Sequence, residues 1–242
     1  MKNQIFFYLF RSRGELKMVN INGKYVNVNN LYSLWAGEYD QNNLLMFLEK
    51  QKTKKLFNFA GKEILDLGCG TGRYAVGLAR KNKVTCVDFN REMLEIAKKK
   101  AKITGVKIEF IQKEVTKYKP KKKFDVILSM LVHDHVKELD KAAKVIFLAS
   151  KKGTDVFISN VHPKFTYQSE FLGKRKMFGE YCTDEYYHPL GEYLEVFRKY
   201  GFELAGSWDL IFEKKYQKMI EVDYPELRGE FLGVLYHFRR IK

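Results

Sequence analysis

The chain has 242 residues, of which 45% are hydrophobic and 15% aromatic. This composition excludes a disordered chain, and the length suffices for a large domain whose core needs neither a disulfide nor a metal. The formal net charge of +15 makes a nucleic-acid partner one hypothesis. Only 10 of the 44 basic residues are arginine, the side chain that binds phosphate in a bidentate manner, so a lysine-rich, solvated surface is the simpler interpretation.

Cysteine usage and hydropathy favour a cytoplasmic protein. Cys69, Cys86 and Cys182 are odd in number and lack the spacing of a ligand set, which argues for a reducing compartment and against a structural zinc. The apolar run at residues 5–10 is too short for a signal peptide, and no later stretch is long enough to cross a bilayer. We therefore expect no membrane association and no bound metal.

Short apolar runs alternate with amphipathic segments through the middle of the chain. This pattern predicts strands at 63–67, 83–88, 106–112, 124–130 and 154–161, with helices between them at 74–81, 91–102 and 139–149. A helix at 188–200, ended by Gly201, and two closing strands at 202–212 and 231–239 follow. The alternation predicts an α/β fold with a doubly wound, mostly parallel seven-stranded sheet and helices on both faces. An insertion at 162–187, rich in aromatic residues and without a clear period, follows the fifth strand.

Three glycines at alternate positions follow the first predicted strand. Asp66 precedes Gly68, Gly70 and Gly72, and a helix follows them. Glycine lets the backbone turn sharply and lets a ligand approach closely, and the start of a helix offers unpaired N–H groups. A dinucleotide-binding loop is the alternative, but it requires a small residue where Arg73 stands. The Asp66 carboxylate would also repel a pyrophosphate, and it suits a ligand that carries an ammonium group.

Further marks follow the glycines in a fixed order. Asp88 ends the next strand, where its carboxylate can accept both hydroxyls of a ribose. Phe89 and Met93 come directly after it, and the pair Glu114-Val115 follows the third strand. Together with the glycine motif, this set resembles the motifs of the class I S-adenosylmethionine-dependent methyltransferases of the small-molecule type, whose fold is Rossmann-like.

The resemblance implies that S-adenosylmethionine is the methyl donor and S-adenosyl-L-homocysteine the product. It implies the methionine moiety at the glycines and Asp66, the ribose at Asp88 and the adenine at Glu114-Val115. The segment 31–40 is similar to the N-terminal lid of small-molecule members, so its aromatic side chains are expected to close the cleft. The donor-binding residues that the resemblance implies are Tyr39, Asp66, Gly68, Gly70, Gly72, Asp88, Phe89, Met93, Glu114, Val115, Ser129 and His135.

Three polar residues are candidates for a general base, which is needed only if the methyl acceptor is an alcohol or another weak acid. His133 and Asp134 follow the fourth strand and His162 ends the fifth, at the edge where an open α/β sheet binds ligands. For each of them a purely structural role stays open. His135 matches a family position that packs beside the donor. The spacing of His133, Asp134 and His135 on one turn makes a poor metal site.

The whole chain, 1–242, is interpreted as a single methyltransferase domain. Its parts are an N-terminal extension (1–30), N-terminal lid helices (31–60), a donor-binding core (61–161), an acceptor-side insertion (162–187) and a C-terminal helix with closing strands (188–242). Residues 1–17 match nothing in this plan, and Met18 is a second candidate for the start. The insertion is expected either to shape an apolar acceptor pocket or to form a satellite core.

A small-molecule acceptor is the leading hypothesis, because the fourth strand lacks the proline motif that accompanies methylation of exocyclic base amines in the family. The basic surface keeps RNA, including tRNA, or a protein as the alternative acceptor. A non-catalytic subunit that binds the donor or a partner is the second alternative. The sequence identifies neither the methylated atom nor the oligomeric state.

Overall fold

The computed structural model describes residues 24–40, 44–162, 181–219 and 228–242, together with the backbone of short strands at 11–12, 15–16 and 175–178. The strands of the main sheet are β4 (Glu63–Leu67), β5 (Lys83–Asp88), β6 (Ile108–Gln112), β7 (Phe124–Met130), β8 (Ser150–Val161), β11 (Phe202–Ile211) and β12 (Phe231–Arg240). The α-helices are α1 (Val28–Trp35), α2 (Leu44–Leu56), α3 (Ala75–Leu78), α4 (Arg91–Thr104), α5 (Leu139–Ala149) and α7 (Leu190–Lys199). The 3₁₀ helices are η1 (Val115–Lys117), η2 (His133–His135) and η3 (Lys214–Met219).

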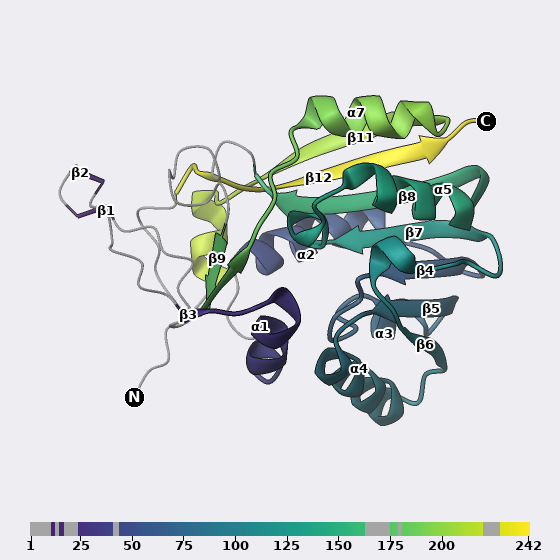
Figure 1. Ribbon diagram of the computed structural model, residues 1–242, viewed down its shortest axis with the longest axis horizontal. Coiled ribbons are helices and arrows are strands. Elements are labelled where there is room, and N and C mark those ends of the chain that lie inside the picture. The colour runs from purple at the N-terminus through teal and green to yellow at the C-terminus, as the bar shows by residue number, and fades with distance from the viewer. Residues whose placement is uncertain are drawn as a thin grey trace.

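The main sheet has seven strands in the order β11-β12-β8-β7-β4-β5-β6 (Figure 1). Neighbours from β8 to β6 pair in parallel, whereas β12 runs antiparallel to both β8 and β11. The predicted α/β fold with a mostly parallel seven-stranded sheet is therefore confirmed.

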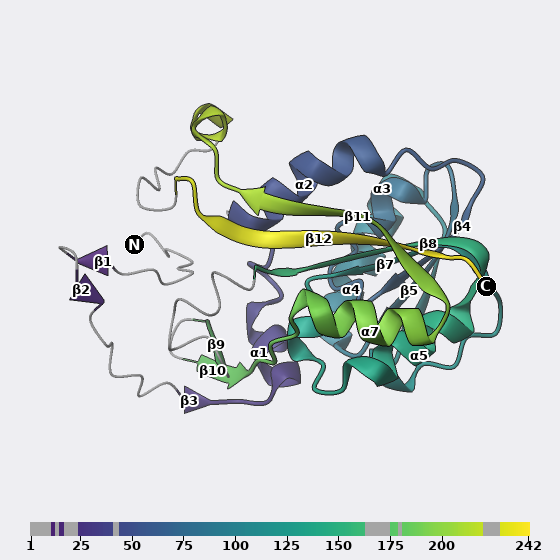
Figure 2. The ribbon, with the colours of Figure 1, turned by 90° about the horizontal axis from the view of Figure 1, so that it is seen from above.

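Helices cover both faces of this sheet. Figure 2 shows α2 and α3 on one side and α5 and α7 on the other. Successive residues of β7 alternate between the two cores: Val126 and Leu128 pack in the cluster with α2 and α4, and Ile127 packs in the cluster with α5 and α7. This alternation follows from the two-residue period of a strand, and because both faces are covered, the strand is apolar throughout.

Local sequence signals set several helix ends. The side chain of Asn90 accepts a hydrogen bond from the Met93 N–H at 2.9 Å and caps the start of α4. Gly105 ends this helix with a φ of 69°, a left-handed conformation that glycine adopts without a Cβ clash. Gly201 follows α7 with a φ of 77°, as expected from the sequence.

The observed bounds differ most from the predicted ones at two elements, and by one or two residues at several others. The helix after the glycines, predicted over eight residues at 74–81, is the single turn α3. Strand β8 begins at Ser150 rather than at 154, because a register shift against β7 between Phe124 and Val126 accommodates the additional residues.

Two small sheets lie outside the main one. Strands β1 (Arg11–Ser12) and β2 (Glu15–Leu16) pair antiparallel. Strand β10 (Tyr181–Asp184) pairs antiparallel with β9 (Arg175–Phe178) and parallel with β3 (Lys24–Tyr25). The segment predicted as an aperiodic insertion thus contains two strands, and residues 163–174 and 179–180 of it lie outside the described part. Within the described part, no helix is both apolar enough and long enough to traverse a bilayer.

Candidate functional site

The carboxyl ends of β4 and β7 lie where the chain changes direction across the sheet. From β4 the chain proceeds outward to β5 and β6, and it then returns to β7 on the other side of β4. Loops at such a switch point leave in opposite directions and open a crevice. A cavity of about 640 Å³ lies there, and residues from α1 and from the ends of β4, β5, β6 and β7 line it.

The glycine loop after β4 forms one wall of the cavity. Gly68 has a φ of 85°, and a Cβ at this position would stand 2.4 Å from a methyl carbon of Val132. Gly70 also lines the cavity, with a φ of 52°. Gly72 instead faces α4, where a Cβ would stand 3.0 Å from the Ala97 Cβ. Gly68 and Gly70 therefore belong to the cavity wall, whereas Gly72 lets α4 approach the loop.

Asp88 lies at the end of β5 and contacts this loop. Its carboxylate accepts hydrogen bonds from the N–H groups of Gly70 and Asn90, each at 2.8 Å, one to each oxygen. Burial raises the pKa of Asp88, and the backbone donors oppose this shift. Because each oxygen retains a further lone pair and the residue lines the cavity, Asp88 can accept a pair of ligand hydroxyls.

Asp66 lies behind the glycine loop and outside the cavity lining that the described residues form. It is 2% exposed, and this burial raises its pKa to about 7, although Arg73 acts in the opposite direction. A carboxyl group with that pKa changes its charge near neutral pH, so the electrostatics of the loop depend on its protonation.

Nine of the twelve residues expected to bind the donor line this single cavity. Ser129 joins Asp66 and Gly72 outside it, and the Ser129 hydroxyl donates to the backbone oxygen of Leu67 at 3.1 Å. The nine are Tyr39, Gly68, Gly70, Asp88, Phe89, Met93, Glu114, Val115 and His135. The structure thus brings together side chains from four loops and the N-terminal segment, although their individual roles remain predictions.

The three candidate bases lie outside the cavity lining in the described part of the chain. His133 is fully buried, with its ring nitrogens 3.1 Å from the Ser129 and Tyr193 hydroxyls, and burial lowers its pKa to about 3. Asp134 accepts from the Val161 N–H at 3.3 Å, and His162 Nε2 lies 3.2 Å from an Asp209 oxygen. Their catalytic roles remain predictions that this geometry does not favour.

The segment 31–40, expected to form an N-terminal lid, contributes to the wall of the cavity. Tyr32 and Tyr39 line it, and Trp35 packs against Tyr39 with ring centroids 4.9 Å apart. The Tyr32 hydroxyl lies 2.8 Å from His135 Nε2, which joins α1 to η2. On the other side of the same imidazole, Nδ1 lies 3.4 Å from the backbone oxygen of Asp184 in β10. The lid, η2 and β10 therefore meet at one histidine.

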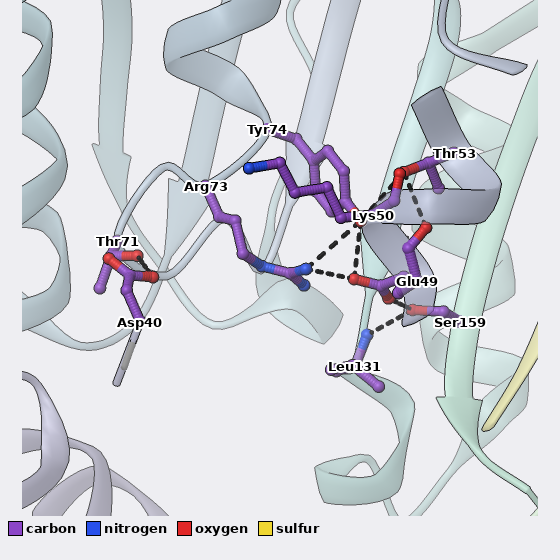
Figure 3. Close-up of polar contacts among 9 residues, drawn as sticks. All are labelled: Asp40, Glu49, Lys50, Thr53, Thr71, Arg73, Tyr74, Leu131 and Ser159. Carbon is purple, nitrogen blue, oxygen red and sulfur yellow. Dashed lines mark hydrogen bonds and ion pairs between the residues drawn. The ribbon is translucent and has the colours of Figure 1, made fainter. Parts of the chain in front are cut away.

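Glu49 on α2 was not predicted as a site residue, yet it is fully buried and contacts Arg73, Tyr74 and Ser159 (Figure 3). A glutamate in a lysine-rich helix gives no signal that its side chain points inward. The link between Thr71 and Asp40 was also missed: the threonine hydroxyl donates to the carboxylate at 2.8 Å and ties the glycine loop to the end of the lid.

Comparison with known proteins agrees with this geometry. Residues 64–153 match the family model described as a methyltransferase domain. The chain is 33% identical over 144 residues to the ubiquinone biosynthesis O-methyltransferase of Pseudoalteromonas translucida, covering 57% of this chain and 59% of that protein. The protein of the same name from Escherichia coli O7:K1 is 33% identical over 105 residues, covering 42% of this chain and 44% of the relative. The chain thus spans about half the length of the curated relatives it matches.

Solved structures share the fold at low sequence identity. An S-adenosylmethionine-dependent methyltransferase from Mesorhizobium loti superposes with a TM-score of 0.66 at 18% identity, over 82% of this chain and all of that one. The magnesium protoporphyrin IX methyltransferase of Synechocystis with bound S-adenosylhomocysteine gives a TM-score of 0.62 at 16% identity, over 88% and 95% of the two chains. In its domain match over residues 64–153, its strand order and its ordered motifs, this chain is similar to the class I S-adenosylmethionine-dependent methyltransferases.

Proposed function

We propose that the protein binds S-adenosylmethionine in the cavity at the ends of β4 and β7 and catalyses transfer of its methyl group to a small-molecule acceptor. The observation that carries this proposal is the meeting of the glycine loop and Asp88 in one cavity of about 640 Å³. Its volume lies in the range of pockets that enclose ligands of this size.

The residues present fit the donor. Gly68 and Gly70 line the cavity without side chains of their own, which leaves room for the methionine moiety. Asp88 offers its free lone pairs to the ribose hydroxyls, and Phe89 and Met93 offer apolar surface to the adenine. When bound, the donor would supply the methyl group of its sulfonium, which departs as a thioether. The protein then contributes mainly by holding donor and acceptor in line, which can lower a barrier by roughly 7–11 kcal/mol.

The acceptor is expected beside the lid. Tyr32 and Tyr186 line the cavity together with Met130 and Leu131 at the end of β7, so this part of the wall is aromatic and apolar. Such a wall admits a small organic molecule and excludes water. The relatives named ubiquinone biosynthesis O-methyltransferase support a small molecule with a hydroxyl group as the acceptor class.

We assign proton removal from that hydroxyl to His135. Among the described histidines it is the one that lines the cavity. Its Nδ1–H points to the Asp184 oxygen and its Nε2 accepts from the Tyr32 hydroxyl, a tautomer that follows from the hydrogen-bond partners. An acceptor hydroxyl that replaces Tyr32 as the donor to Nε2 can pass its proton to the ring.

Binding and transfer are tested in sequence. Calorimetric titration with S-adenosylmethionine, S-adenosylhomocysteine and NADH is expected to give micromolar binding of the two adenosyl ligands alone. Transfer of radiolabelled methyl is then measured to a panel of phenols and catechols, and to tRNA in parallel. Transfer to tRNA alone would replace the small-molecule acceptor by RNA, and donor binding without transfer to either would favour a non-catalytic subunit. Absence of donor binding would refute the proposal.

A further inference from the structure

Glu49 carries a carboxylate into the apolar core between α2 and the sheet. Its side chain is fully buried, and a buried charge is costly unless it is paired and hydrogen-bonded. Figure 3 shows its two oxygens directed at different partners: Oε2 contacts Arg73 and Tyr74, and Oε1 contacts Ser159. These partners lie on separate segments of the chain, so a single carboxylate joins three elements.

The first oxygen holds the exit of the glycine loop. Arg73 and Tyr74 directly follow Gly72; Arg73 forms an ion pair with Glu49, and the Tyr74 hydroxyl donates to the same oxygen at 2.7 Å. Burial alone would lower the pKa of Arg73, but the Glu49 carboxylate outweighs it and raises the pKa. The guanidinium therefore stays charged, and the loop that forms one wall of the cavity is fixed to α2.

The second oxygen holds a further part of the cavity wall, at Leu131, through Ser159. The Ser159 hydroxyl donates to Glu49 and accepts from the Leu131 N–H at 3.0 Å, and the same N–H also donates to the Ser159 backbone oxygen at 2.9 Å. Leu131 lines the cavity and has a φ of 59°, which makes it the one non-glycine residue in the described part of the chain with a left-handed backbone. Such a conformation is strained for a residue with a Cβ and persists only where its surroundings impose it.

We propose that Glu49 is a positioning residue that couples the glycine loop on the donor side to Leu131 on the acceptor side. Loss of contact at either oxygen lets the carboxylate move and loosens the segment held by the other. The proposal rests on the proposed function only for the names of the two sides. A core ion pair without coupling would instead confine each effect to the segment whose contact was removed.

Amide hydrogen exchange of the ligand-free protein tests this coupling on both sides. Ser159→Ala removes the acceptor-side contact, and we expect exchange of the amides at 69–73 to accelerate at least about threefold. Tyr74→Phe removes a donor-side contact, and exchange at 130–132 is expected to accelerate similarly, because coupling is reciprocal. Ser150→Ala is the matched control: this serine is buried at the other end of β8, with its hydroxyl donating to Phe147. Faster exchange confined to each variant's own side would overturn the proposal.

A second readout uses the dissociation constant of S-adenosylhomocysteine in wild type, Ser159→Ala, Tyr74→Phe and the double variant. If the two segments are coupled, the fold-change in the dissociation constant of the double variant should differ by at least about threefold from the product of the fold-changes in the two single variants. A simple product, or an unchanged constant in Ser159→Ala, would contradict it. If the wild type binds no S-adenosylhomocysteine, the proposed function fails while the exchange experiment still decides the coupling. Glu49→Gln should loosen both segments, and if it does not fold, the single-contact variants decide.

Discussion

Replacement of Asp88 by asparagine tests the donor site most directly. The carboxylate accepts backbone N–H groups from Gly70 and Asn90 and lines the cavity with its remaining lone pairs. Asparagine keeps one accepting oxygen, but its amide must point an N–H₂ group at one of the backbone donors and loses the negative charge. A hydrogen bond to a charged group contributes about 1.5–3 kcal/mol, so donor binding should weaken roughly 10- to 150-fold.

The assay is calorimetric titration of Asp88→Asn with S-adenosylhomocysteine. Asp125→Asn is the matched control. The Asp125 carboxylate also accepts a backbone N–H from a neighbouring strand, that of Glu63 at 2.9 Å, but it lies at the opposite end of the sheet from Asp88. The control should bind as the wild type does. A loss of less than threefold in Asp88→Asn, with the fold intact by circular dichroism, would refute the assignment of Asp88 to the ribose.

Three further changes probe the same site. Gly68→Ala places a Cβ 2.4 Å from Val132 at a φ of 85°, so urea unfolding should show a loss of about 1–3 kcal/mol, and an unchanged midpoint would contradict the clash. Because the pKa of Asp66 rises from 3.8 to about 7 on folding, the folded state holds a proton that the unfolded state releases. As the pH rises from 5 to 7, the free energy of unfolding of the wild type should therefore fall by about 2 kcal/mol relative to that of Asp66→Asn. Parallel profiles of the unfolding free energy against pH in the two proteins would count against this. His135→Gln should lower kcat on an accepted phenol roughly hundredfold at saturating donor, and unchanged kcat would exclude His135 as the base.

The donor half of the site could be predicted because it is local in sequence. The glycines, Asp88 and Met93 belong to one strand–helix–strand–helix stretch, and each lies at the end of an element that the hydrophobic pattern reveals. In a parallel sheet those ends meet at one edge, so sequence order alone places the side chains together. The parallel sheet itself followed from the continuous apolar strands.

Side-chain direction on an irregular turn could not be predicted. His133 and His135 are two residues apart on η2; the family resemblance placed His135 beside the donor, but the local pattern does not distinguish the orientation of the two side chains. The structure turns His133 into the core between Ser129 and Tyr193, and it turns His135 into the cavity beside Tyr32. Both orientations depend on partners 60 and 103 residues away in the chain.

The family match covers the part of the site that is local in sequence, and it leaves open the part that depends on contacts between distant segments. Residues 64–153 contain nearly all the predicted donor-binding positions, whereas α1, β10 and Glu49 lie outside that range and contribute the lid and the support of Leu131. The predicted donor-binding positions therefore fall mainly in one contiguous segment, which matches the methyltransferase domain model. The proposed acceptor wall combines Met130 and Leu131 of this segment with Tyr32 and Tyr186 from the flanking segments, and its geometry depends on contacts between them. Because Glu49 contacts the glycine loop through one oxygen and the Leu131 wall through the other, a change in the flanking segments that alters acceptor choice should also alter donor affinity.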